Sequence, residues 1–441
     1  MASHILWQNV QKTVTLLDIP RSIVEAQGFN SPDSHALLSS KPREMPYPSS
    51  EPKSAKAKAK LVDNTVDQEL HSEYRELLTQ AMREVSQHHT GDWCLSRPFV
   101  EETRPQKKRK LDEVADDDGN VLPASRPIVQ NVASMPDHLL SNLARTTPGS
   151  GQVRFKHPDA DPSTLPDANG GGDLNTRYRS NDSDEHLSIS IAEMSEPGSQ
   201  TFDFLIPTRS CFYLGDCTDS HNFRKAFRQH ARRHGSRSTF DFILLDPPWP
   251  NRSIKRTHKS GGATYRTIPT LDDLGTMIFD MQLDTIMAEN ALLGVWITNM
   301  QAARELVLGL GGLFECCGVD FTEEWIWLKT TTSGDPTSVL DAQWKKPYEV
   351  LLLGRRRDVD IDHKQNETKP TTKRRVIVAV PDLHSRKPCL KRLIEPLLPN
   401  SENYTALEVF SRHLVAGWCS WGDECIKFNW DGYWNKQRSL Q

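Results

Sequence analysis

Asp246-Pro247-Pro248-Trp249 follows directly on the apolar run Phe240 to Leu245. These residue types suit the activation of an exocyclic purine amine, a poor nucleophile because its lone pair is shared with the ring. A carboxylate accepting one N–H bond and a main-chain carbonyl accepting the other would free that lone pair. Prolines have no N–H and a fixed φ, so they hold a carbonyl rigidly, and the tryptophan offers the base an aromatic surface. The sequence therefore predicts a site that alkylates an amine.

Asp246 is expected to act first as a hydrogen-bond acceptor and only secondarily as a general base. A sulfonium methyl group is already a strong electrophile, so alignment and desolvation contribute most of the catalysis. The alternative interpretation is a proline-rich strand exit without a function.

Strand-length apolar runs alternate with helical patterns from about residue 203 onward. Expected strands are Phe240 to Leu245, Leu292 to Ile297, Trp325 to Leu328, Val350 to Leu353 and Val376 to Val380. Expected helices are Phe223 to Arg233, Leu271 to Ala288, Ala302 to Leu308, Leu390 to Leu397 and a segment near Leu407. This alternation predicts an α/β fold with a mostly parallel sheet covered on both faces. Ligands of such sheets bind at the carboxyl ends of the strands.

The chain of 441 residues divides by composition into three parts. Residues 1–91 are expected to form an N-terminal region with short strands and a helix. Residues 92–202 have little apolar periodicity and are expected to be a largely disordered linker, and residues 203–441 are expected to form the catalytic domain. The apolar period within residues 60–90 favours a helix that packs on its own domain, with docking on a partner protein as the alternative.

Bulk composition and short sequence runs limit the possible classes of protein and of binding site. A net charge of −4 provides no global field for nucleic acid, so contacts must come from local basic stretches. Lys107 to Lys110 is typical of a nuclear-import signal, which predicts the nucleus, with the cytoplasm as the alternative. The eight cysteines include no spaced pair, so no metal site is expected. Neither a membrane span nor a signal peptide is expected from the apolar runs.

The motif and several later blocks resemble the eukaryotic N6-adenine methyltransferase family that includes the catalytic subunit of the messenger-RNA methyltransferase. The blocks are Lys346-Pro347-Tyr348-Glu349, His384 through Pro388, Phe410-Ser411-Arg412, Gly417-Trp418 and Trp421-Gly422. Together with Leu16 to Arg21, they are similar more narrowly to the methyltransferase-like-four branch. The resemblance covers about 205–441 well and the first 25 residues loosely. It implies a Rossmann-like class I methyltransferase fold, S-adenosylmethionine as cofactor, and adenine N6 in nucleic acid as the acceptor.

The resemblance also implies a set of cofactor contacts: Asp216, Cys217, Asp246, Lys387, Glu408, Arg412, Gly422, Asp423 and Glu424. Asp216 would meet the adenine of the cofactor, although a helix N-cap is its ordinary interpretation. Asp246 would touch both the methionine end of the cofactor and the substrate amine. Asp423 stands where the family often has Asn. His413 also departs from the family pattern, and no role is assigned to it.

Substrate contacts are expected from Tyr265, Trp327 and Glu349. Trp327 could instead be core and Glu349 a surface residue at the edge of its strand. The polar loop after the motif, residues 251–262, carries Arg252, Lys255 and Arg256, which could contact phosphates. An ordinary solvated loop is the alternative.

RNA is favoured over DNA as the substrate, because a single strand exposes its bases without base flipping and no duplex-reading motif is visible. The branch that the chain resembles makes 2′-O-methyladenosine in small nuclear RNA the leading candidate. DNA methylation and a non-catalytic, RNA-binding scaffold subunit remain the alternatives.

Overall fold

The computed structural model describes residues 3–48, 67–99, 135, 138–145, 153–156, 177–195, 198–250, 268–342, 346–357, 372–384 and 386–436. The loop 251–262, Tyr265 and the basic run Lys107 to Lys110 lie outside these residues, so the expectations for them stay predictions. Within the described ranges, no helix combines the length and apolar character needed to cross a membrane.

A sheet of eleven strands organises the molecule. In spatial order the strands are β1 (Ile5–Gln8), β2 (Val14–Leu17), β13 (Lys373–Ala379), β11 (Val319–Lys329), β12 (Tyr348–Arg356), β10 (Met287–Ile297), β9 (Phe240–Leu245), β14 (Ala406–Val409), β15 (Trp418–Gly422), β8 (Cys211–Leu214) and β5 (Tyr178–Ser180). Only β1, β12 and β5 run antiparallel to their neighbours. The predicted α/β, Rossmann-like architecture with a mostly parallel sheet is confirmed.

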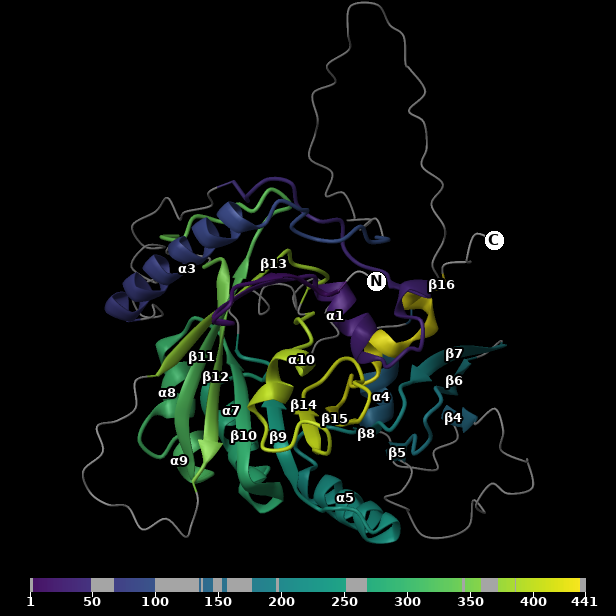
Figure 1. The fold of residues 1–441 in the computed structure, drawn as a ribbon. Coiled ribbons are helices and arrows are strands. Elements are labelled where there is room, and N and C mark those ends of the chain that lie inside the picture. The colour runs from purple at the N-terminus through teal and green to yellow at the C-terminus, as the bar shows by residue number, and fades with distance from the viewer. Residues whose placement is uncertain are drawn as a thin grey trace, which may run out of the picture.

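Helices cover both faces of this sheet (Figure 1). One face carries α3 (Gln68–His88), α5 (Ser220–His234), α7 (Leu271–Asp280), α8 (Gln301–Leu308) and α9 (Leu313–Cys316). The other carries α1 (Ile19–Ala26) and α10 (Lys391–Ile394). Because both faces are covered, central strands such as β9 are almost continuously apolar.

Two expected helices are wrong. The helix expected over Leu271 to Ala288 ends at Asp280, Gln282 adopts a positive φ of 50°, and β10 begins at Met287. The helix expected near Leu407 is strand β14, whose four residues are all buried between β9 and β15. Its Ala, Leu and Glu favour helix intrinsically, but pairing on both sides overrides that preference.

The N-terminal strands join the main sheet, because β2 pairs with β13 through Val14 and Val376. Helix α3 lies over the same region and buries Tyr74, Leu78 and Val85. The Tyr74 hydroxyl donates to the buried Glu324 carboxylate at 2.6 Å. The apolar face of this helix therefore packs on its own sheet, as the first of the two interpretations had it, and is not available to a partner protein.

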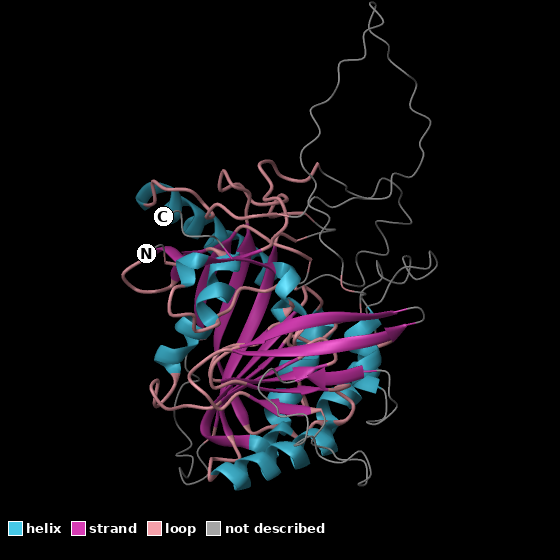
Figure 2. Ribbon diagram, turned by 90° about the vertical axis from the view of Figure 1, so that its right-hand side faces the viewer, coloured by secondary structure: helices cyan, strands magenta, loops and turns pink. Residues whose placement is uncertain are grey.

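Part of the interval expected to be linker has regular structure. It contains α4 (His138–Arg145), β4 (Val153–Lys156), β5 and β6 (Leu187–Ser195), and β6 pairs with β7 (Gly198–Ile206). This hairpin reaches out from the side of the main sheet (Figure 2). Ile189 and Ile191 pack with Phe202 and Phe204 in a separate core, and their period of two is a strand pattern. A further short pair joins β3 (His35–Leu37) to β16 (Trp434–Lys436).

Candidate active site

The site lies at the carboxyl edge of the sheet, where β9 and β14 run side by side. Leu245 pairs with Val409, and the Asp246 N–H donates to the Val409 carbonyl at 3.3 Å. From β9 the chain continues to β10 on one side, and from β14 to β15 on the other. The two strands thus flank a topological switch point, the usual ligand position in open α/β sheets.

Asp246 belongs to a chain of alternating charges. The Lys387 ammonium donates to both Asp246 carboxylate oxygens, at 2.9 and 3.0 Å. The same ammonium lies 3.1 Å from Glu349 Oε2, and the other Glu349 oxygen accepts from Lys329. Four residues, from the turn after β9, from β11, from β12 and from the loop before α10, therefore meet at one point.

This arrangement keeps Glu349 and Lys387 charged. Burial alone would raise the pKa of Glu349, but Lys387 and Lys329 outweigh it and hold that pKa well below its usual range. Burial alone would lower the pKa of Lys387, but Asp246 and Glu349 raise it instead. At neutral pH, the ammonium of Lys387 is thus a fixed cation between two carboxylates.

Indole rings line the same region. Trp327 packs edge to face against Trp296 with centroids 6.2 Å apart, and the Lys329 ammonium lies 4.7 Å from the Trp327 ring. The Lys387 ammonium lies 5.6 Å from the Trp296 ring. The buried Trp327 Nε1 has no hydrogen-bond partner among the described residues. Both rings are almost fully buried in the core, as the alternative interpretation of Trp327 had it, and they pack against the ammonium groups of Lys329 and Lys387.

The Asp246 to Trp249 motif turns tightly at the end of β9. The Pro247 carbonyl accepts the Trp249 N–H at 2.8 Å, and the Trp249 indole N–H donates to the Trp296 carbonyl at 2.8 Å. The Pro247 carbonyl is thus engaged within the turn. Among the described residues, the Pro248 carbonyl receives no hydrogen bond, so it is the acceptor available to a ligand.

Glu408 lies on β14 next to Asp246. Its side chain is buried, and no described residue donates a hydrogen bond to it. Burial and the neighbouring Asp246 carboxylate, only partly offset by Lys387, raise the pKa of Glu408 to about 8. A buried carboxyl without a partner is costly unless a ligand supplies the hydrogen bonds.

Replacing Glu408 with Gln should stabilise the protein near pH 9 but have little effect near pH 5. Between the pKa of about 4.3 of an unfolded glutamate and about 8 in the folded state, folding binds a proton, so stability falls as pH rises through this window. Glutamine cannot ionise and escapes this loss. Thermal denaturation at several pH values measures the effect, with the exposed Glu402→Gln as control. A Tm difference between Glu408→Gln and wild type that does not grow with pH would contradict the raised pKa of Glu408.

The predicted cofactor residues beyond β14 lie at the same edge, after β8 and β15. Asp216 Oδ1 accepts the Thr218 N–H at 3.0 Å, in the turn before α5, while the residue at the N-cap of α5 is Asp219. The Gly215 N–H donates to the Gly422 carbonyl at 3.3 Å, which brings Asp216 and Asp423 to neighbouring strand ends. Cys217 is different: its side chain is buried in the core, and burial raises the pKa of its thiol.

Arg412 and Glu424, each expected to contact the cofactor, form an ion pair with each other. Arg412 Nε lies 3.3 Å from the buried Glu424 carboxylate, which also accepts from Lys427 at 2.7 Å. Glu424 thus orients Arg412 at the end of β14. Burial, and then Arg386, lower the pKa of the neighbouring His413 to about 4, so its imidazole is neutral.

The structure brings together most of the predicted residues, from Asp246 to Trp249 with Trp327, Glu349, Lys387 and Glu408. Sequence reasoning missed Lys329 and Trp296. Lys329 is a polar residue at the end of an apolar strand, the same signal that points to Asp246. Trp296 lies inside an apolar run and had no such signal.

One group in the described part of the chain has spacing that suits a metal ion: Asp182, His230 and His234. Each imidazole Nε2 lies 3.9 Å from an Asp182 oxygen. These residues come from α5 and the turn after β5, not from the carboxyl edge. The expectation that the chain uses no metal stays a prediction.

Known proteins match the part of the chain that contains the candidate active site. Residues 240–424 match the profile of the family described as MT-A70. The chain is 44% identical over 195 residues to the "N6-methyladenosine RNA methyltransferase MTA1" of Cryphonectria parasitica, covering 44% of this chain and 54% of that protein. It is 34% identical over 232 residues to the "N(6)-adenine-specific methyltransferase METTL4" of Homo sapiens, covering 51% of this chain and 43% of that protein.

A third relative is the "DNA N6-methyl methyltransferase" of Caenorhabditis elegans, 31% identical over 223 residues, with 50% of this chain and 53% of that protein covered. The chain thus spans about half the length of the curated relatives that it matches. METTL4 and MTA1 proteins both occur among them, so the narrower resemblance to the methyltransferase-like-four branch stays a prediction.

Proposed function

Because the chain belongs to the MT-A70 family, we propose that it transfers a methyl group from S-adenosylmethionine to the N6 amino group of adenine in a nucleic acid. The observation that carries the proposal is the position of Asp246. It follows the central strand at the switch point, and both of its carboxylate oxygens are held by Lys387.

The residues at the carboxyl edge fit the cofactor that methyltransferases of this family use. S-adenosylmethionine carries an ammonium group, a carboxylate, ribose hydroxyls and an adenine amine. Glu408 is a buried carboxyl without a partner in the described structure and could accept from the ribose hydroxyls. Asp216 could accept from the adenine amine, Asp246 from the ammonium, and Arg412 could pair with the cofactor carboxylate.

When bound, the cofactor supplies an electrophilic methyl group. The residues of this chain prepare the acceptor. Asp246 accepts one N–H of the adenine amine, because each of its carboxylate oxygens keeps a free lone pair in addition to the one that binds Lys387. The Pro248 carbonyl accepts the other N–H. Trp249 is fixed by its bond to the Trp296 carbonyl and limits the movement of the base. Alignment of the amine is thereby the main contribution of the protein.

RNA is our first candidate substrate, with 2′-O-methyladenosine of small nuclear RNA as the leading form and DNA as the second candidate. The names of the C. parasitica and C. elegans relatives support RNA and DNA respectively. We also propose that the protein acts in the nucleus, on the basis of the Lys107 to Lys110 run.

Transfer of labelled methyl groups tests the proposal. The full chain is incubated with labelled S-adenosylmethionine and one of three matched oligonucleotides: RNA, the same RNA with 2′-O-methyladenosine, and DNA. Label recovered as N6-methyladenine supports the activity, and the most productive oligonucleotide identifies the substrate. A chain that binds the cofactor in calorimetry but methylates none of them would exclude these substrates. A chain that also fails to bind cofactor would favour the non-catalytic scaffold.

A further inference from the structure

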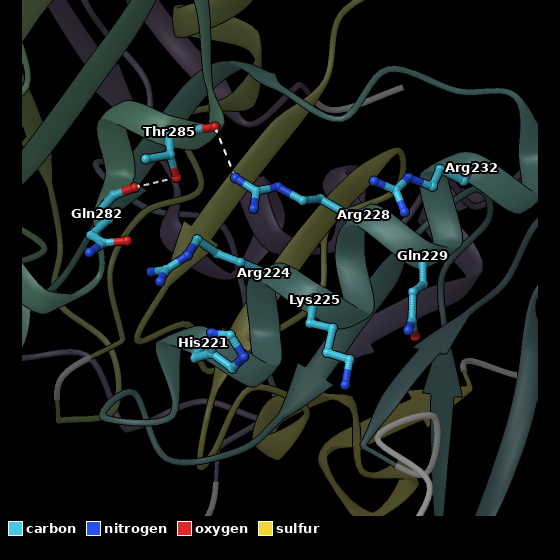
Figure 3. A pocket seen from close by; sticks show the side chains of 8 residues that line it. All are labelled: His221, Arg224, Lys225, Arg228, Gln229, Arg232, Gln282 and Thr285. Atoms are coloured by element: carbon cyan, nitrogen blue, oxygen red, sulfur yellow. Dashed lines mark hydrogen bonds between the residues drawn. The ribbon is translucent and has the colours of Figure 1, made fainter.

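A groove of about 450 Å³ lies along α5, away from the candidate active site. It is lined by His221, Arg224, Lys225, Arg228, Gln229, Arg232, Gln282 and Thr285 (Figure 3). Gln282 and Thr285 come from the segment before β10, whereas Asp246 follows the end of the parallel strand β9. The groove and Asp246 are therefore at opposite edges of the sheet, separated by roughly the 20 Å length of β9.

The lining is strongly basic. Four of its eight residues are Arg or Lys, and none is Asp or Glu. Helix α5 itself contains no acidic residue. None of the four cations forms an ion pair with a carboxylate in the described ranges. In a chain with a net charge of −4, this surface is a local concentration of positive charge.

Not all of these cations have a structural role. Arg224 donates to the Met281 carbonyl and ties α5 to the segment before β10, and Figure 3 shows it extending toward that segment beside Arg228. Lys225 and Arg232 are exposed and make no hydrogen bond with a described residue. Arg232 lies in the last helical turn, where the helix dipole favours a cation, but Lys225 lies near the middle of α5, where it does not.

We infer that this groove binds the phosphodiester backbone of the nucleic acid on which the proposed methyltransferase acts. Lys225, Arg228 and Arg232 recur at intervals of three and four residues, so they form a row on one helix face with about one turn, roughly 5.4 Å, between neighbours. A row of cations suits a chain of phosphates better than a single phosphate. Arg232 can hold phosphate oxygens with two N–H groups. Arg228 donates through Nη2 to the Thr285 carbonyl at 3.5 Å and has its other N–H groups for a phosphate, and Gln229 and Gln282 add neutral donors.

The test uses matched charge reversals in the full chain. The groove variant is Lys225→Glu/Arg232→Glu. The control is Arg83→Glu/Arg233→Glu, which changes the net charge equally at exposed positions outside the groove. Arg233 neighbours Arg232 in the last turn of α5, so any effect on the helix dipole is shared. Thermal denaturation and calorimetry with S-adenosylmethionine confirm that each variant folds. If the charge-reversal variant does not fold, the neutral variant Lys225→Gln/Arg232→Gln replaces it.

Binding of a fluorescent single-stranded RNA is measured over a salt series, with inorganic phosphate as competitor. We expect the groove variant to raise Kd by about tenfold or more at low salt and to reduce the salt slope by about one to two. The control should stay close to wild type, and millimolar phosphate should compete only weakly. An unchanged Kd in the groove variant, or an equal loss in the control, overturns the inference. Binding needs no turnover, so a chain that binds RNA through the groove without methylating it contradicts the proposed function alone.

Discussion

Replacing Asp246 with Asn should reduce methyl transfer by about a hundredfold to a thousandfold, the usual cost of losing one positioned polar group in an active site. Asparagine keeps the shape and one carbonyl oxygen. It loses the negative charge that pairs with Lys387, and its amide can turn a donor toward the substrate amine. Single-turnover methyl transfer with labelled cofactor measures the change directly.

Asp241→Asn is the matched control, because Asp241 lies on the same strand at the opposite end. There its carboxylate accepts from the Thr405 N–H at 2.8 Å and pairs with Arg237. The control should stay within a few-fold of wild type, since Asp241 lies away from the switch point. If Asp246→Asn kept a rate close to that of the control, Asp246 would not be the acceptor of the substrate amine.

Replacing Lys387 with Met should both destabilise the fold and weaken cofactor binding. The variant leaves Asp246 and Glu349 facing each other without the ammonium between them. Breaking a buried ion pair costs several kcal/mol, and partial exposure reduces this to about 2–4 kcal/mol here. Lys387→Arg restores the charge and should recover most of the stability, although its different shape can still reduce the rate.

The pH dependence of this loss identifies its cause. In the wild type, the lowered pKa of Glu349 contributes stability above the usual glutamate pKa, and that stability is lost as pH falls through the folded value. Without Lys387 the contribution shrinks, so the Tm gap between wild type and Lys387→Met should be widest at neutral pH. It should stay wide down to about pH 4, the usual glutamate pKa, and narrow as pH falls further toward the lowered folded value. A gap that is constant with pH would indicate lost packing instead of unpaired charge.

The chemistry of the motif could be anticipated from the sequence because its signals are local. A buried strand, two prolines and an aromatic occupy consecutive positions from Phe240 to Trp249. Strand and helix periodicity also predicted a mostly parallel sheet. Lys387, Glu408 and Arg412 came from the family resemblance, because nothing in their local sequence marks a ligand contact.

The ion-pair chain could not be anticipated in this way. Lys387 is separated from Asp246 by 141 positions in the chain, and only the strand order brings them together. Strand β14 differs from the expected helix for a related reason. Its intrinsic preferences are weak, and the free energy gained by pairing with β9 and β15 decides its conformation.

The sequence by itself determined the reactive motif, the class of fold and the residue types available for catalysis, since these depend on neighbours along the chain. The tertiary structure alone decided which charges neutralise one another, which carboxyl is buried without a partner among the described residues, and where the cations of α5 form a groove. Those properties depend on distances and burial between elements far apart in sequence, and no local pattern encodes them.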